Sequence, residues 1–399
     1  MKKNYYIFAC SFFFSLGGNI LGLSLIYRLT DRFSFSPGQI GSFVAMGQLF
    51  YFLGCNLYHR FGSIVNPIKI FPVAAAVVFA ASIPVGFAPS RAFVYAAYWI
   101  MQIATGLFWP PVMAWLTGEL SQKELNRQIS IFNRSWMAAC IIGPLAAGAL
   151  YRWNSTVNFF LLALSYFLVL VFLFLMKRNI TASGVPPAAS SVAQELSGNE
   201  KEENLPANSL VDKRLDLYRY RGWIGAFSST LLLGILGNIV PIHLRDGLGF
   251  TERSAGMVLF IRSISGFIAF SVFARFSSWH FSRRWSMFLQ GGLMLCAFLF
   301  IFAGSRLLLF SSIAIICGFM NSGAYNTSIF YCGATGKNPR KNMALHEIFL
   351  ALGNATGSAG GGFIYQHFRF SGTCLALFLF LGLGMVLHIL LNKNEDRSA

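Results

Sequence analysis

The sequence predicts an all-α integral membrane protein with twelve transmembrane helices, arranged as two pseudo-symmetric six-helix bundles. The first observation behind this prediction is composition, because 55% of the 399 residues are hydrophobic and 11% are charged, whereas a soluble domain has about 25% charged residues. Second, twelve apolar stretches have the length of about 20 residues that crosses a bilayer. Third, the first half of the chain recurs in the second half.

The repeat has a nearly constant offset along the chain. Four pairs share one offset: Phe35 and Phe250, Gly41 and Gly256, Arg60 and Arg275, and Phe61 and Phe276. Four further pairs share an offset that is shorter by a single position: Arg127 and Lys341, Gly143 and Gly357, Gly148 and Gly362, and Tyr151 and Tyr365. Two similar hydrophobic halves joined by one polar stretch are common among secondary transporters, so solute transport is the leading functional prediction.

The predicted spans follow one another through short loops, with one exception. In the first half they lie near 5–27, 38–58, 68–87, 92–116, 129–151 and 156–176. In the second half they lie near 223–244, 254–274, 285–304, 307–332, 343–366 and 371–391. Residues 178–222 are the only long polar segment, and their polar composition predicts a flexible cytoplasmic linker. The two bundles are therefore expected to be residues 1–177 and 223–399.

Two basic stretches allow more than one interpretation. Residues 213–221 are expected to be the positively charged flank of the seventh span, and the alternative is a short amphipathic helix on the membrane surface. The apolar run after Met1-Lys2-Lys3 continues through Tyr27, which is too long for the apolar core of a signal peptide. This run is therefore predicted to be the first span.

The net charge of +17 follows the membrane topology. With the N-terminus placed in the cytoplasm, the inside segments hold 21 Lys and Arg residues and the outside loops hold 8. This asymmetry predicts a multi-pass protein of the cell (inner or plasma) membrane with both termini cytoplasmic. The basic face is expected to meet anionic lipid headgroups of the bilayer. Nucleic acid is not an expected partner, because no basic patch interleaved with aromatic residues is present.

The sequence lacks the usual patterns of enzymes and metal proteins. Its seven cysteines are odd in number and form no CxxC, so neither a disulfide framework nor a metal site is expected. No Walker A, HExxH or GxSxG pattern occurs. We therefore predict no enzymatic activity, no cofactor and no direct drive by ATP.

Three local patterns carry a family resemblance. Residues 54–62, after the second span, end in an Arg-Phe-Gly sequence whose counterpart in the second half holds Arg275. The fifth span contains Gly143-Pro144, where a small residue permits close helix packing and Pro permits a bend. The fourth span contains Trp109-Pro110-Pro111. Together with the six-plus-six layout, these patterns resemble the major facilitator superfamily over nearly the whole chain.

The resemblance implies gating roles at the cytoplasmic side. In this family an acid in the loop after the second span latches the cytoplasmic gate, and His59 stands where that acid is expected. The Gly-Pro element of the fifth span is associated with exporters. The implied gating residues are His59, Arg60, Gly62, Arg275, Gly143 and Pro144.

Among the acids, lysines and arginines, three lie well inside predicted spans: Arg134, Arg262 and Glu347. Each costs about 3 kcal/mol or more in the bilayer centre unless it is paired or hydrated, so each is a functional candidate. We expect Arg134 and Arg262 to bind an anionic substrate group, and Glu347 to be a proton site or the partner in an ion pair. The alternative for Arg134 and Glu347 is that both side chains reach the cytoplasmic surface.

The resemblance also implies that spans 1, 4, 7 and 10 line the substrate cavity. The candidate residues for substrate binding there are Asn19, Gln102, Trp109, Asn238, Asn321 and Tyr325, together with Arg262 from span 8. Amides and aromatic rings suit a ligand with polar and apolar parts. The alternative role for each is hydrogen bonding between helices.

The sequence therefore predicts a secondary active transporter or facilitator that acts as a monomer. It would move a small anionic, zwitterionic or amphipathic solute by alternating access, and protons are the expected coupling ion if transport is active. The alternative is a membrane sensor or scaffold that keeps the transporter fold without moving solute. Substrate-dependent flux distinguishes the two.

Overall fold

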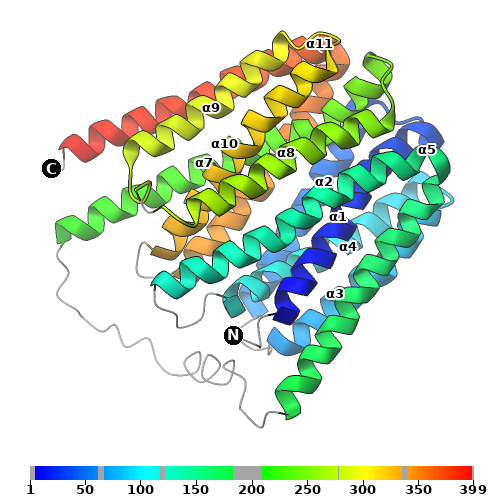
Figure 1. The fold of residues 1–399 in the computed structure, drawn as a ribbon, viewed down its shortest axis with the longest axis horizontal. Helices are drawn as coiled ribbons and strands as arrows, with labels where there is room; N and C mark the ends of the chain where they lie inside the picture. Colours follow the sequence, from blue (N-terminus) through cyan, green and yellow to red (C-terminus); the bar gives the residue numbers. More distant parts are fainter. Residues whose placement is uncertain are drawn as a thin grey trace.

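The computed structural model describes residues 5–61, 67–116, 122–182, 209–276, 278–334 and 339–397. Within these ranges the chain is helical, without a β-strand (Figure 1). The helices of the first half are α1 (Tyr5–Phe33), α2 (Pro37–Phe61), α3 (Pro67–Phe87), α4 (Arg91–Leu116) and α5 (Gln122–Ala182). Those of the second half are α7 (Ser209–Ile242), the short π-helix η2 (His243–Gly247), α8 (Glu252–Phe273), α9 (Arg283–Ile301), α10 (Leu307–Ala334) and α11 (Pro339–Arg397).

Two of these helices are each two membrane spans. Helices α5 and α11 contain 61 and 59 residues, which would make each about 90 Å long if straight, three times the thickness of a bilayer core. Each contains one residue with non-helical backbone angles, Asn154 in α5 and Arg369 in α11, and α5 visibly turns back on itself (Figure 1). Ten long apolar helices in the described ranges therefore supply the twelve predicted spans. The two breaks are separated by the same offset as Phe35 and Phe250, so they too follow the repeat.

The predicted linker needs a correction at both ends. Helix α5 continues to Ala182 and α7 already begins at Ser209, so residues 209–222 are helical rather than part of a flexible segment. The physical reason is burial, because Tyr218 and Arg221 are 7% and 1% exposed. The Tyr218 ring contacts Tyr331 of α10 at 5.4 Å. Residues 183–208 lie outside the described part of the chain.

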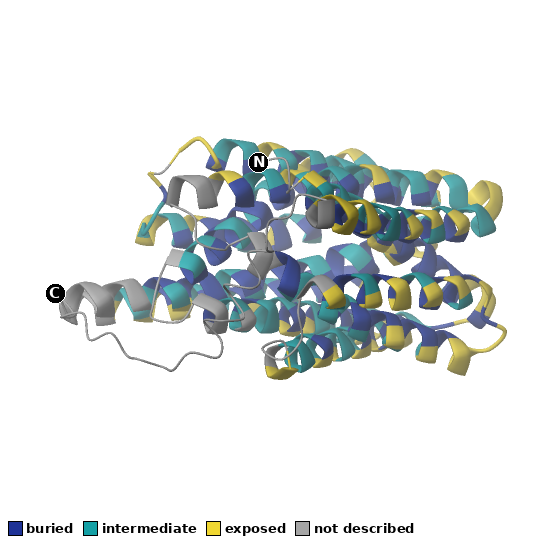
Figure 2. Cartoon of the chain, turned by 90° about the horizontal axis from the view of Figure 1, so that it is seen from below, coloured by how far each residue is buried: buried dark blue, intermediate teal, exposed yellow. Residues whose placement is uncertain are grey.

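The two halves form two layers of helices (Figure 2). They meet mainly along two contacts, α2 with α11 and α5 with α8. Many large apolar side chains point outward, including Phe174 at 66% and Leu308 at 79% exposure. Such a surface suits contact with lipid tails, and the positions between the two layers are the natural place for a polar site.

Candidate functional site

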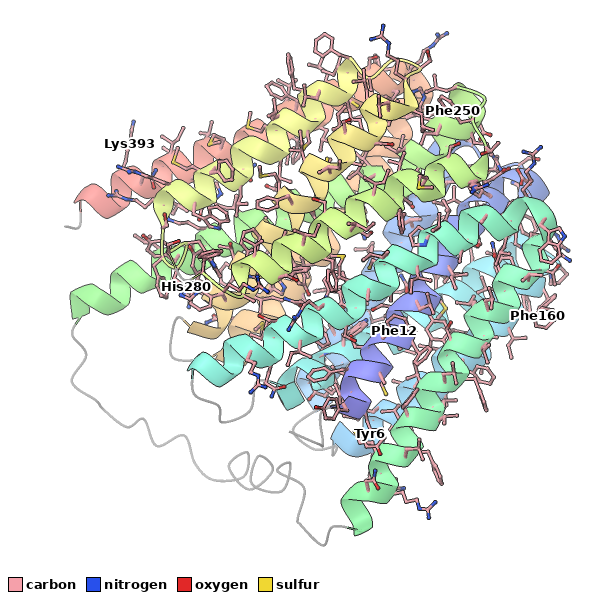
Figure 3. All side chains as sticks on the ribbon, viewed as in Figure 1. Tyr6, Phe12, Phe160, Phe250, His280 and Lys393 are labelled. Atoms are coloured by element: carbon pink, nitrogen blue, oxygen red, sulfur yellow. The ribbon has the colours of Figure 1, made fainter. Side chains whose placement is uncertain are left out.

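The bundle has two different ends. Tyr6, His280 and Lys393 mark the end that carries both chain termini, and Phe160 and Phe250 mark the opposite end (Figure 3). We call the first the proximal end and the second the distal end. The turns between α1 and α2 and between η2 and α8 lie at the distal end.

Two glycine crossings hold the halves together towards the distal end. A Cβ added to Gly41 of α2 would lie 2.2 Å from the carbonyl oxygen of Ser358 and 3.2 Å from the Cα of Gly362 in α11. A Cβ added to Gly256 of α8 would lie 2.5 Å from the carbonyl oxygen of Pro144 and 3.4 Å from the Cα of Gly148 in α5. Backbones can approach this closely only where side chains are absent. The glycines paired by the sequence repeat therefore occupy equivalent places in the two contacts.

The predicted Gly143-Pro144 element takes part in this packing. The Pro144 carbonyl oxygen lies close to the Cα of Gly256, across the contact between α5 and α8. A Cβ on Gly143 would lie 2.6 Å from the Cβ of Asn19, so this glycine lets α1 pack against α5. Both residues are thus placed at helix contacts, as expected of small residues.

An ion pair also joins the halves at the distal end. The Arg245 guanidinium of η2 lies 3.0 Å from the Asp31 carboxylate of α1, and it covers the Tyr27 ring at 4.6 Å. The hydroxyl of Tyr151 donates a hydrogen bond of 3.0 Å to Asp31. This pair was not among the residues predicted from the sequence. The repeat offered a signal, because Asp31 recurs as Asp246, directly beside Arg245, at the offset that separates Phe35 from Phe250.

Arg262 lies at the middle of α8, as the eleventh of its 22 residues. Its Nη2 donates only to the neighbouring Ser263 hydroxyl, at 3.3 Å, and its buried Nε has no hydrogen-bond partner. Within the described ranges, no acidic side chain forms an ion pair with it. The thiols of Cys140 in α5 and Cys317 in α10 are near. Arg262 is thus a cation at mid-membrane depth without a described counterion.

Asn19 of α1 reaches the same place from the first half. Its amide nitrogen donates to the Cys140 sulfur at 3.2 Å and to the Ser15 carbonyl at 2.8 Å. Cys140 therefore has Asn19 as a hydrogen-bond partner and Arg262 in its electrostatic neighbourhood. The fold brings together two of the predicted substrate-binding residues from different halves.

The other amides of the predicted cavity fall into two groups. Asn238 of α7 is buried, and its amide donates to the Gly234 carbonyl at 2.7 Å and to the Ser358 hydroxyl at 2.9 Å. Gln102 of α4 donates to the Tyr98 hydroxyl at 3.2 Å. Both amides thus donate to protein groups, Gln102 within α4 and Asn238 within α7 and to α11. Asn321 of α10 differs, because its buried carbonyl oxygen has no partner.

The predicted aromatic residues belong to ring clusters. Trp109 of α4 contacts the rings of Phe14 and Phe108 at 5.2 and 5.4 Å. Tyr325 of α10 contacts Trp136 of α5 at 5.6 Å. The contact between Tyr325 and Trp136 crosses between the halves on the proximal side.

Glu347 and Arg134 are not an ion pair in the described structure. The Tyr51 hydroxyl of α2 donates a hydrogen bond of 2.8 Å to Glu347 of α11. Arg134 of α5 is exposed and donates to the Ser130 carbonyl at 3.2 Å. The reason is topological, since Glu347 lies at the contact of α2 with α11 while α5 contacts α8. His346, beside Glu347, was not predicted; it is buried and hydrogen-bonds Ser328 at 2.8 Å.

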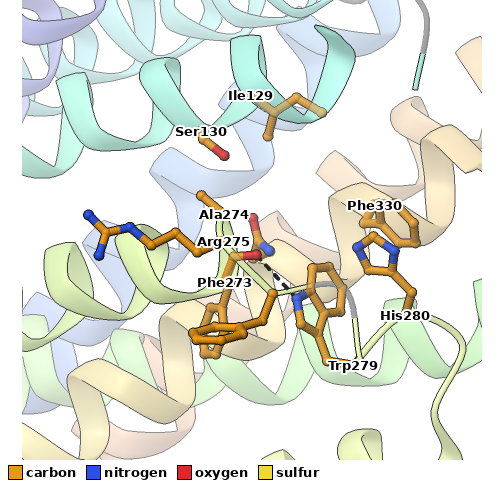
Figure 4. A pocket seen from close by; sticks show the side chains of 10 residues that line it. Ile129, Ser130, Phe273, Ala274, Arg275, Trp279, His280 and Phe330 are labelled. Carbon is orange, nitrogen blue, oxygen red and sulfur yellow. Dashed lines mark hydrogen bonds between the residues drawn. The ribbon is translucent and has the colours of Figure 1, made fainter. Parts of the chain in front are cut away.

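A cavity of about 90 Å³ lies between the halves at the proximal end (Figure 4). Ser130 of α5 faces it from one half, and the segment after α8, with Arg275 and His280, faces it from the other. The His280 ring stacks on Phe330 at 3.9 Å, and burial lowers the pKa of this imidazole. The two halves thus contact each other towards both ends, and a small cavity lies between them at the proximal end.

Of the remaining predicted gating residues, Arg60 is the one whose side chain the structure describes. Arg60 is exposed in the last turn of α2. Gly62 and the side chain of His59 lie outside the described part of the chain. No contact of the expected latch can therefore be assigned to them.

Comparisons with known proteins agree with this architecture. A family model described as Major Facilitator Superfamily matches residues 7–341 and 222–399. A POT family transporter in complex with 5-aminolevulinic acid has a TM-score of 0.72 at 12% identity, covering 99% of this chain and 96% of that one. The human organic anion transporter MFSD10 (TETRAN) has a TM-score of 0.67 at 14% identity, covering 96% and 98%.

A further similar structure is a bacterial homolog of the human lysosomal transporter Spinster, in an inward-facing and occupied conformation. It has a TM-score of 0.71 at 12% identity, covering 100% of this chain and 98% of that one. At such identities the likeness concerns the fold. No curated protein sequence matches the chain.

Proposed function

The chain belongs to the major facilitator superfamily, and from this premise we propose that it moves a small organic anion across the membrane by alternating access, with Arg262 as the residue that binds the anionic group. Membership makes the chain a multi-pass transporter of small solutes rather than an enzyme. The substrate class and the mechanism are the proposed part.

The observation that carries the proposal is the unpaired state of Arg262. A cation near the bilayer centre costs about 3 kcal/mol or more without a partner. Its Nε lacks a hydrogen bond and no described acid neutralises it. An anionic ligand would supply the missing charge. The amide of Asn19 donates to Ser15 and Cys140, and it would exchange its bond to the Cys140 sulfur for one to the ligand.

The free carbonyl oxygen of Asn321 supports a zwitterionic variant of this substrate. Asn321 follows Gly318 by one turn, and Gly318 packs against the Arg262 backbone, so acceptor and cation are on neighbouring helices. An ammonium group could donate to Asn321 while a carboxylate meets Arg262. Two proteins of the same fold are described as an organic anion transporter and as a complex with 5-aminolevulinic acid. For this chain the support comes from Arg262 and Asn321 themselves.

Glu347 is the proposed proton site. Its only described hydrogen-bond partner is the hydroxyl of Tyr51, across the contact of α2 with α11. When the halves move apart at this contact, the carboxylate loses that bond, and taking up a proton would offset the loss. Proton binding would thereby depend on the conformation, which is what coupling requires. Facilitated diffusion without Glu347 titration is the alternative.

The proposed orientation places the proximal end in the cytoplasm of the cell membrane, because 21 Lys and Arg residues fall on that side and 8 on the other. The ion pair and the glycine crossings would then lie on the outer side, and the 90 Å³ cavity would lie on the cytoplasmic side. The protein would act as a monomer. Its two bundles, residues 1–177 and 223–399, would rock against each other, and the second would include the part of α7 that begins at Ser209.

A thermal-stability screen of the purified protein against carboxylates, phosphate esters, amino acids and drugs tests the proposal. A ligand at a hundred times its Kd stabilises a protein by about 2.7 kcal/mol. We expect hits among organic anions that disappear in Arg262→Gln and persist in Arg306→Gln, since Arg306 is exposed between α9 and α10. Anion hits that survive Arg262→Gln would overturn the assignment.

A further inference from the structure

A second cavity lies on the outer surface, at the proximal ends of α8, α9 and α10. Its volume of about 520 Å³ falls within the range of about 300–1,000 Å³ typical of ligand sites. It is separate from Arg262 and therefore does not depend on the transported substrate. Its lining is aromatic, with Phe273, Trp279, Trp285, Phe288 and Phe319 as the main contributors.

The floor of this groove is a connected series of rings. Phe273 contacts Phe319 at 5.3 Å and Trp285 at 5.4 Å, and Trp285 stacks on Phe288 at 5.5 Å. The indole nitrogen of Trp285 donates to Thr327 at 3.2 Å, which fixes its ring. The floor is thus preformed rather than assembled by a ligand. Phe276 and Phe288 remain 60% and 52% exposed at its sides, which opens the groove towards the bilayer.

One cation stands at the rim. Arg284, in the first turn of α9, lines the groove and is exposed. No acidic residue lines the groove with it. An apolar groove lined by two Trp residues and one exposed Arg matches the membrane interface, where Trp rings collect at headgroup depth and basic residues attract anionic lipids.

We propose that this groove binds one anionic phospholipid from the leaflet next to the proximal end. An acyl chain would lie on the aromatic floor and the phosphate would contact Arg284. A small soluble anion does not fit this proposal, because it would leave the aromatic floor unused. The groove therefore favours a ligand that combines a negatively charged group, next to Arg284, with a hydrocarbon chain on the aromatic floor.

The bound lipid would also act on the mouth between the halves. Phe273, Phe276 and Trp279 line both this groove and the 90 Å³ cavity at the proximal end. These residues belong to α8 and the segment after it, which also carries Arg275 and His280. An acyl chain packed against Phe273, Phe276 and Trp279 in the groove would restrict the motion of these residues towards the cavity between the halves. Anionic lipid is thus expected to stabilise the described arrangement of the mouth.

Quenching of Trp fluorescence by phospholipids with brominated chains tests the site, using the full-length protein in detergent. Phosphatidylglycerol should quench at lower concentration than phosphatidylcholine with the same chains. Arg284→Gln should weaken phosphatidylglycerol binding about fivefold, as expected for one interfacial cation. It should weaken phosphatidylcholine binding less, because the choline already partly neutralises the phosphate of that lipid. Trp285→Phe should remove a large part of the quenching while keeping an aromatic floor.

Arg306→Gln is the matched control, because it removes an exposed Arg between α9 and α10 at the opposite end. Equal binding of the two lipids by the unmodified protein would overturn the proposal. So would equal effects of Arg284→Gln and Arg306→Gln, or competition by inorganic phosphate at the same concentration as the lipid. Thermal unfolding of each variant without lipid verifies that the fold is intact.

Discussion

Asp31 of α1 and Arg245 of η2 form an ion pair of 3.0 Å that connects the two halves at the distal end. The Arg245 side chain is 12% exposed and that of Asp31 is 47% exposed. A partly exposed pair of this kind contributes about 0.2–1 kcal/mol. Because the pair exists only while the distal ends touch, its energy favours the described state over a distally open one.

Asp31→Asn should therefore shift the population towards distal opening, by up to about fivefold for a loss of about 1 kcal/mol. Spin labels at Phe160 and Phe302, both exposed and in different halves, would measure the separation of the distal ends. Arg306→Gln serves as a control that removes one exposed charge, of the opposite sign, outside the ion pair. An unchanged distance distribution in Asp31→Asn would show that the pair does not hold the halves together.

The glycine crossing of α2 and α11 provides a second prediction. A Cβ on Gly362 would lie 2.5 Å from the Pro37 carbonyl oxygen and 3.1 Å from the Cα of Gly41. Gly362→Ala should destabilise the described state by about 1–3 kcal/mol, because the added methyl group would overpack this contact. Gly360→Ala, on the same helix with no atom within 4 Å, should be neutral or stabilising. Thermal unfolding of both variants measures the difference, and equal melting temperatures would contradict the close contact.

The fold could largely be predicted from the sequence, because the length of a membrane span and the close approach of helix backbones each demand a recognisable residue pattern. The breaks at Asn154 and Arg369 follow from hydrophobic stretches too long for one span, and the repeated glycines mark where backbones touch. The start of α7 could not be predicted, because the basic residues near Arg221 suggest water exposure while the fold buries this side chain almost completely. Charge count alone does not reveal such burial.

The candidate site could be predicted only in part. Arg262 was identifiable because a cation within an apolar stretch needs an explanation. The roles of the amides could not be separated, since Asn238 and Asn321 look alike in sequence and differ only in their neighbours. Asp31 and Arg245 were missed because charged residues in loops are ordinary, and only the tertiary contact makes this pair a link between halves.

The different hydrogen bonding of Asn238 and Asn321 gives a third prediction. Asn238→Ala removes two hydrogen bonds, to Gly234 and Ser358, and should lower the unfolding free energy by roughly 1 kcal/mol, at about 0.6 kcal/mol for each bond in a membrane. Asn321→Ala removes an oxygen that has no partner, so it should change stability little and weaken ligand binding. Thermal unfolding with and without an anion from the Arg262 screen separates the effects. The reverse pattern would exchange the roles of the two residues.

The contact between Tyr51 and Glu347 gives the last prediction, which concerns coupling. If Glu347 carries the transported proton, Glu347→Gln should abolish accumulation driven by a pH gradient while leaving exchange of the same anion across proteoliposomes, because the amide keeps the shape and cannot titrate. Tyr51→Phe removes only the hydrogen bond of 2.8 Å and should keep accumulation with an altered pH dependence. Uptake with an imposed gradient and counterflow without one are the two measurements. Accumulation that persists in Glu347→Gln would exclude this residue as the proton site, and loss of both activities would indicate that Glu347 is needed for the conformational change itself.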